Sequence, residues 1–195
     1  MLQRTKTLVS TAVLTALSIV LSFVILYEMP MGGSVTLACM LPIMLVSLRY
    51  GCKWGLGAAF VTALFQLLQA VMHANVFPYC ETWQSLVLCI LFDYLVPFTV
   101  IGFAGLFRKV SLGRVRNFGA YAGMLAVFLA RFCCHVVTGV VIWGQWAPEG
   151  MGKYFYSLAY NGSFLLFECI ITMVLGVILL ETPQLRRFMQ TEKQK

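Results

Sequence analysis

The chain has 195 residues, of which 61% are hydrophobic and only 11% are charged, and its formal net charge is +7. A soluble domain carries roughly 25% charged residues, so this composition excludes an ordinary soluble fold and indicates a surface that mostly meets lipid. Because the cations sit in short clusters beside apolar runs rather than on one folded face, nucleic acid is excluded as a partner.

The apolar runs of this chain predict helices. Lipid offers the backbone no hydrogen bonds, so a spanning segment is either a helix or a strand of a closed barrel. Barrel strands are short and alternating, whereas these runs are long and apolar on every side. In chain order we predict spans at Leu8–Tyr27, Val35–Leu48, Trp54–Met72, Trp83–Phe107, Phe118–Trp143 and Phe155–Leu180. The first is too long for a signal peptide and no cleavage site follows it, so we expect it to be retained.

The segment Val35–Leu48 is the weakest of the six, because its residues rise only about 21 Å as a helix and Pro42 interrupts it. Lys and Arg are enriched in cytoplasmic loops, so their distribution tests the count. With six spans, one side holds twelve cations and the other only Lys153; with five, the division falls to ten against three. The twelve are Arg4, Lys6, Arg49, Lys53, Arg108, Lys109, Arg114, Arg116, Arg186, Arg187, Lys193 and Lys195.

The predicted fold class is therefore all-α: a polytopic membrane protein whose residues 1–195 form a single domain of six transmembrane helices. Both termini are expected in the cytoplasm. No internal repeat supports the inverted-repeat architecture of many secondary transporters. The seven cysteines are scattered, with no CxxC and no His at ligand spacing, so we expect no metal site and no cofactor.

Titratable side chains within spans are costly and invite a functional reading. Arg131 and Glu168 fall at similar depth near mid-membrane, and we expect them to form an ion pair, with a ligand or coupling role as the alternative. Asp93 has no obvious permanent cation unless Arg131 serves it. A cationic ligand is therefore a natural alternative partner for this carboxylate.

A second group of polar and aromatic side chains falls in the outer half of the membrane. His135, Gly139 and Trp143 recur every four residues and so share one helix face. Each residue also has a plainer explanation, as an interfacial aromatic anchor or an interhelical hydrogen bond. Together they suit a small, flat, positively charged heteroaromatic ligand. The group consists of Asp93, His135, Trp143, Tyr156 and Asn161.

Two further patterns concern helix contacts. Gln66, Gln69 and His73 lie three and four residues apart, which favours hydrogen bonding between helices. Ala12 and Ala16 form a small-xxx-small pair that lets another helix approach closely, either inside this protein or from a partner.

Several stretches resemble the thiamine-specific substrate-binding subunits of energy-coupling factor (ECF) transporters, in the same order through nearly the whole chain. The most specific are RFCCHVVTGVVIWGQWAPEG at 131–150 and the following YSLAYNGS at 156–163. The others are PMGGSV at 30–35, LPIMLVSLRYG at 41–51, DYLVPF at 93–98 and GFAGLFRK at 102–109.

The resemblance implies a six-helix subunit that captures thiamine from outside and works with a transmembrane coupling protein and two ATPases. It places the family's ligand contacts on Asp93, His135, Trp143, Tyr156 and Asn161, with Tyr94 following the acid as in the family motif. It also makes Glu28–Ser34 a lid, with Gly32 and Gly33 supplying flexibility, and Ala12 and Ala16 the face toward the coupling protein.

The sequence departs from the family pattern in two places. Asp93 stands where some members have Glu, and residues 31–36 lack a Trp and a Glu that some members carry, so Trp83 is the aromatic residue offered instead.

The chain has no GxxxxGK[ST] motif, so we expect it to be no ATPase and no enzyme. A membrane hydrolase is disfavoured because paired-histidine and GxSxG motifs are missing. The remaining alternatives are a subunit for a related vitamin and an ion-coupled secondary transporter using Asp93, Arg131, His135 and Glu168.

Overall fold

The computed structural model describes residues 2–73, 76–113 and 115–190. Three cations of the charge comparison, Arg114, Lys193 and Lys195, lie outside these ranges. Helices and strands follow one another as α1 Leu2–Ser22, β1 Ile25–Glu28, η1 Pro30–Gly32, β2 Ser34–Thr36, α2 Leu41–Tyr50, α3 Cys52–His73, η2 Phe77–Tyr79, α4 Trp83–Cys89, η3 Ile90–Leu95, α5 Val96–Thr99, η4 Val100–Phe107, α6 Phe118–Val141, η5 Trp143–Trp146, α7 Lys153–Glu181 and α8 Pro183–Gln190. The segment η3 is a π-helix, and the other η segments are 3₁₀-helices.

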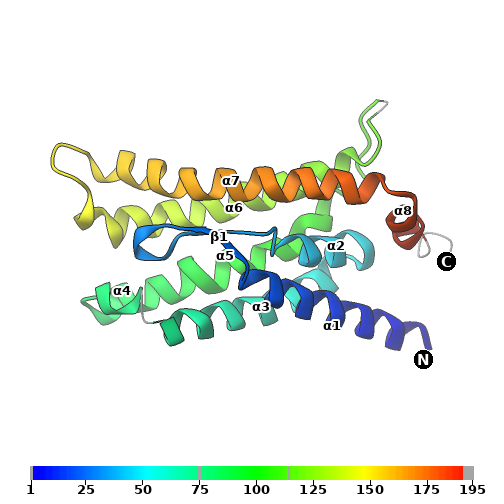
Figure 1. Ribbon diagram of the computed structural model, residues 1–195, viewed down its shortest axis with the longest axis horizontal. Coiled ribbons are helices and arrows are strands. Elements are labelled where there is room, and N and C mark those ends of the chain that lie inside the picture. The colour runs from blue at the N-terminus through cyan, green and yellow to red at the C-terminus, as the bar shows by residue number, and fades with distance from the viewer. Residues whose placement is uncertain (1, 74–75, 114, 191–195) are drawn as a thin grey trace.

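Five helical runs in the described ranges are long and apolar enough to cross a membrane: α1, α3, the continuous run Trp83–Phe107, α6 and α7. They run along the long axis of the molecule, and both ends of the chain lie at one end of the bundle (Figure 1). The opposite end holds α4 and the turn between α6 and α7. The prediction of a helical membrane protein is confirmed, and the predicted bounds of the fourth span match the structure.

The predicted second span is helical only in its C-terminal part. Its helix, α2, has ten residues, which rise about 15 Å, half the hydrocarbon thickness. The preceding residues are extended or irregular and include β2. Ile43, Met44 and Val46 are fully buried, so α2 packs among the longer helices and irregular backbone beside it is shielded from lipid, as the bilayer requires.

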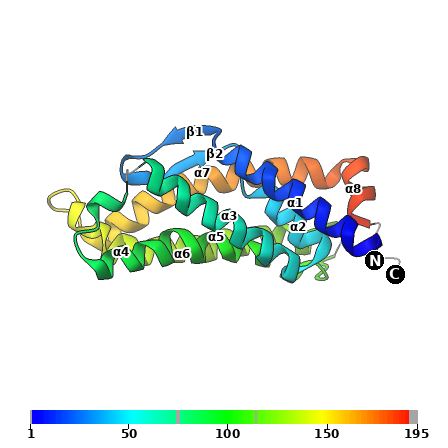
Figure 2. The same cartoon turned by 90° about the horizontal axis from the view of Figure 1, so that it is seen from below.

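The first helix begins and ends earlier in the chain than predicted, because α1 is Leu2–Ser22 and Ile25–Glu28 forms the strand β1. This strand pairs antiparallel with β2, with Tyr27 opposite Val35. The all-α prediction therefore misses a hairpin. Apolar and β-branched residues around Ile25 suit a strand as well as a span, so hydrophobicity alone did not separate the two. Figure 2 shows the hairpin along the side of the bundle formed by α7.

The helices of this bundle expose apolar side chains and bury hydroxyls. Val13, Leu129 and Phe167 are about 60% exposed, at 62%, 57% and 60%, as lipid-facing side chains should be. The inward face of α1 instead carries small hydroxyl residues, and Ser18 donates to the Cys39 carbonyl at 2.5 Å. Ala12 and Ala16 lie on the opposite, exposed face of α1.

Candidate functional site: a pocket between the hairpin, α6 and α7

A pocket opens near the end of the bundle that holds α4. It contains about 750 Å³ of empty space, part of which is open to solvent. The hairpin covers one side, α6 and η5 form the wall, and α3, η3 and α7 complete it. The lining residues are Gly32, Gly33, Ser34, Gln66, Val76, Asp93, Tyr94, Phe98, Arg131, His135, Gly139, Trp143, Tyr156, Ser157, Tyr160, Asn161 and Phe164.

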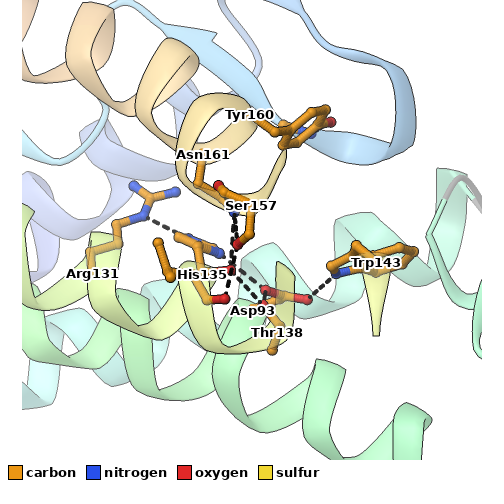
Figure 3. Close-up of polar contacts among 10 residues, drawn as sticks. Asp93, Arg131, His135, Thr138, Trp143, Ser157, Tyr160 and Asn161 are labelled. Atoms are coloured by element: carbon orange, nitrogen blue, oxygen red, sulfur yellow. Dashed lines mark hydrogen bonds and ion pairs between the residues drawn. The ribbon is translucent and has the colours of Figure 1, made fainter. Parts of the chain in front are cut away.

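Asp93 is held by three side-chain donors on the α6 side of the pocket. Thr138 donates a short hydrogen bond to Oδ1, His135 Nδ1 lies 3.1 Å from the same oxygen, and Trp143 Nε1 donates to Oδ2 at 3.1 Å (Figure 3). Its side chain is only 12% exposed. A carboxylate has about four acceptor positions, so one remains for a ligand.

The backbone at Asp93 is a π-helical segment, η3, within the fourth span. Such segments hold an extra residue within a helix and occur often at functional sites. The extra residue rotates the side chains that follow it. This local irregularity sets the direction in which Asp93 projects.

His135 joins Asp93 to Arg131. Its Nδ1 faces Asp93, and its Nε2 accepts from Arg131 Nε at 3.2 Å. These two partners assign the proton to Nδ1, because guanidinium only donates. Both ring nitrogens are thereby occupied, so His135 presents a ring face and edge, rather than a free nitrogen, to a ligand.

Asn161 is fixed by the close approach of α6 and α7. Its Nδ2 donates to the His135 carbonyl at 3.1 Å and to the Ser157 carbonyl at 3.0 Å. A Cβ on Gly139 would lie 2.1 Å from Ser157 Oγ, so only glycine allows this contact. The amide nitrogen is thus directed at backbone, and the carbonyl oxygen of Asn161 is left as the acceptor for a ligand.

Aromatic rings also line the pocket. Trp143 is oriented by its bond to Asp93, and Tyr94 packs on Phe77 with ring centroids 5.8 Å apart. Tyr156 lies 5.8 Å from Tyr160 at a tilt of 38°. Rings placed around one carboxylate suit a flat cation, which gains from stacking, cation–π attraction and charge.

The connection between β1 and β2 closes over the pocket and is fastened to α7. The Tyr160 hydroxyl donates to the Pro30 carbonyl and accepts from Gly33 N at 3.4 Å. A Cβ on Gly33 would lie 2.9 Å from Phe164, and one on Gly32, where φ is +101°, would lie 2.6 Å from Val76. The two glycines therefore permit close packing of the loop; the predicted flexibility stays a prediction.

The expected ion pair between Arg131 and Glu168 is wrong, because the structure gives each a different partner. Glu168 accepts from Thr36 N at 2.5 Å and Thr36 Oγ1 at 2.7 Å. Arg131 lies over the Phe98 ring, 4.3 Å from its centroid. Among the described residues no carboxylate lies within 4.0 Å of the guanidinium. Thr36 of strand β2 donates to Glu168 instead. This backbone N–H was not predictable, because the strand itself was not predicted.

The structure gathers six of the seven predicted ligand residues in one pocket: Asp93, Tyr94, His135, Trp143, Tyr156 and Asn161. Trp83 is not among them; it begins α4 and is 72% exposed. Of the glutamines in α3, Gln66 lines the pocket, while Gln69 bonds Ser22 as an interhelical contact.

Three polar residues at the site were not predicted from the sequence: Thr138, Ser157 and Tyr160. Each lies three or four residues from a predicted site residue on the same helix, namely His135, Asn161 and Tyr156, and that spacing was the available signal. In the described ranges no cluster of three His, Cys, Asp or Glu side chains has the arrangement of a metal site. The site is suited to holding a ligand by rings, one carboxylate and one amide.

Known proteins resemble this chain along most of its length. The family model described as "Thiamine transporter protein" matches residues 8–187. The "Thiamine transporter ThiT" of Bacillus subtilis is 33% identical over 188 residues, covering 91% of this chain and 92% of that protein. The ThiT of Lacticaseibacillus paracasei is 32% identical over 155 residues, covering 75% and 73%.

A solved structure has the same fold. ThiT from Listeria monocytogenes superposes with a TM-score of 0.72 at 25% identity, covering 93% of this chain and 97% of that one. The family match includes most of α1, the other four long helices and all the residues that line the pocket. The chain belongs to the thiamine transporter protein family.

Proposed function

We propose that this chain is the thiamine-binding subunit of an ECF-type importer, with the pocket around Asp93 as its thiamine site. The observation that carries the proposal is the coincidence, in a chain of this family, of a buried carboxylate with oriented aromatic rings. Thiamine consists of a flat aminopyrimidine and a thiazolium cation. Buried cations need a charged or polar partner, and Asp93 provides one.

The side chains have separable roles in this proposal. Trp143 stacks on one thiamine ring, and Asp93 accepts from the aminopyrimidine or balances the thiazolium charge. Tyr94 and Tyr156 complete the aromatic walls, and Asn161 sets orientation through its free carbonyl oxygen. His135 fixes Asp93 and contributes its ring face. The loop at residues 28–34 acts as the lid.

Energy would come from partner subunits: a transmembrane coupling protein and two ATPases. The support is the exposed small-residue face of α1 that carries Ala12 and Ala16, where another helix can approach closely. The end rich in cations would face the cytoplasm, by the positive-inside rule, and the pocket would open outside. We propose no catalytic reaction for the chain.

The test is titration of purified protein in detergent with thiamine, followed by tryptophan fluorescence, with riboflavin and biotin as controls. Saturable quenching by thiamine alone is expected. Failure of thiamine to bind would overturn the assignment, and tighter binding of another vitamin would reassign the subunit. Uptake into vesicles by the isolated chain, without ATPases, would instead favour an ion-coupled transporter.

A further inference from the structure

A second pocket lies at the opposite end of the bundle, where α8 and both chain ends are found (Figure 1). It is bounded by the end of α2, the connection between η4 and α6, the end of α7, and α8. It contains about 2240 Å³ of empty space, part of which is open to solvent. The charged residues of its lining are all cations: Arg49, Arg108, Lys109, Arg116 and Arg186. Within the described ranges, no acidic side chain lines it.

A described carboxylate that contacts two residues of the lining is already engaged. Glu181 pairs with Arg186 at 2.7 Å and accepts from Asn117 and Tyr121 at 3.0 Å each. This pair leaves Arg49, Lys109 and Arg116 without neutralisation by Glu181. The pocket therefore keeps an excess of positive charge.

Arg49 is the strongest indication of a ligand. Its guanidinium lies 3.3 Å from the centroid of the Phe188 ring, and its Nε and Nη1 are enclosed with no acceptor among the described residues. Enclosed donors without acceptors are unfavourable. The planar donor fork of arginine fits a phosphate with two parallel hydrogen bonds.

Arg108 has a different role, because its Nη1 donates to the Arg49 carbonyl at 3.2 Å. This contact ties the end of η4 to the end of α2. It holds the wall that carries Arg49 in place. Arg108 thus holds the wall together, and Arg49 lines the pocket.

The surroundings of this pocket favour a lipid over a soluble anion. Val110, Leu112 and Val115 are 48%, 57% and 53% exposed on the loop that also carries Lys109 and Arg116. Exposed apolar residues interleaved with cations are typical of segments that lie in the membrane interface. Basic pockets beside the ends of transmembrane helices bind phosphate-bearing headgroups.

From these observations we propose that the pocket around Arg49 binds the phosphate headgroup of an anionic phospholipid. The lipid phosphate pairs with the Arg49 guanidinium where it lines the pocket, while Lys109 and Arg116 add charge from the loop. The apolar loop residues contact the acyl boundary. The proposal is independent of what the thiamine pocket binds.

The test is native mass spectrometry of delipidated protein titrated with dioleoyl phosphatidylglycerol, dioleoyl phosphatidylcholine or inorganic pyrophosphate. We expect phosphatidylglycerol to bind at least about fivefold more tightly than phosphatidylcholine. Arg49→Gln should weaken that binding about tenfold, and Arg116→Gln, an exposed position, about threefold to fivefold. The matched control is Arg4→Gln, which removes an exposed arginine of α1 outside this pocket and should change nothing.

Equal binding of the two lipids, or an equal loss in Arg4→Gln, would overturn the proposal. Pyrophosphate that binds as tightly as phosphatidylglycerol and displaces it would show a site for soluble phosphate instead. Thermal unfolding of each variant in detergent confirms that it is folded. If Arg49→Gln fails that check, Lys109→Gln and Arg116→Gln decide.

Discussion

Asp93 and Glu168 both carry a carboxylate inside the helix bundle, but their surroundings differ. Asp93 receives its hydrogen bonds from side chains that line a pocket. Glu168, 2% exposed, receives its bonds from the backbone and hydroxyl of Thr36. One carboxylate keeps an acceptor position facing a cavity, whereas the other fastens the hairpin to α7. Burial alone thus does not distinguish a ligand site from an anchor; the chemical nature of the donors does.

The largest effect on binding is expected from Asp93→Asn. Loss of the charge should weaken thiamine binding about 100-fold, or about 2.7 kcal/mol, because a hydrogen bond to a charged group is removed from a desolvated site. Calorimetric titration measures this loss. The control is Glu81→Gln, at an exposed acid that does not line the pocket. An unchanged thiamine affinity in Asp93→Asn would show that the carboxylate does not contribute to binding.

Glu168→Ala should act on stability first. It leaves the Thr36 N–H and hydroxyl enclosed without an acceptor, which costs about 2 kcal/mol of unfolding free energy. Thermal unfolding in detergent measures the loss. Thr36→Val should lower the unfolding free energy less in the Glu168→Ala variant than in the unchanged chain, because both substitutions remove the same contact. If Glu168→Ala lowered thiamine affinity as much as Asp93→Asn at unchanged stability, the distinction between site and anchor would fail.

Tyr160→Phe tests whether the loop at residues 28–34, which contacts α7, acts as a lid. Loss of the hydroxyl removes the bond to the Pro30 carbonyl, worth about 1 kcal/mol, so thiamine should bind about fivefold more weakly. Stopped-flow fluorescence should place most of the change in faster dissociation. Tyr154→Phe, at a tyrosine 66% exposed on the same helix, is the control. A change confined to the association rate would argue against a lid.

The smallest effect is expected from Trp83→Phe. Trp83 is 72% exposed and does not line the pocket, so thiamine affinity should stay within about twofold. Displacement of a fluorescently labelled thiamine by unlabelled thiamine measures this affinity, and its signal does not come from Trp83. A loss of tenfold or more would show that α4 moves onto the ligand.

Much of the fold follows from the sequence, because lipid makes long apolar runs helical. The run Trp83–Phe107 was predicted with the bounds it has. The hairpin was not, since residues around Ile25 are apolar whether they form a helix or a strand. The same limit applies to Glu168, whose partner is a backbone group of that hairpin.

The pocket residues were largely predictable for a different reason. Orientation in the membrane put five polar and aromatic side chains at comparable depth, and helical spacing put His135 and Trp143 on one face. What spacing did not supply was the choice of hydrogen-bond partner. Asp93 bonds Thr138 as well as His135, and that choice depends on how η3 is wound.

The π-helical winding of η3 has a consequence for how this site tolerates change. Each residue of a regular α-helix advances the side-chain direction by about 100°, so deletion of one residue between Ile90 and Asp93 would restore regular winding and turn the carboxylate out of the pocket. Substitutions at the same positions leave the winding in place. In η3 the number of residues therefore matters more for the position of the Asp93 carboxylate than the identity of the residues next to it.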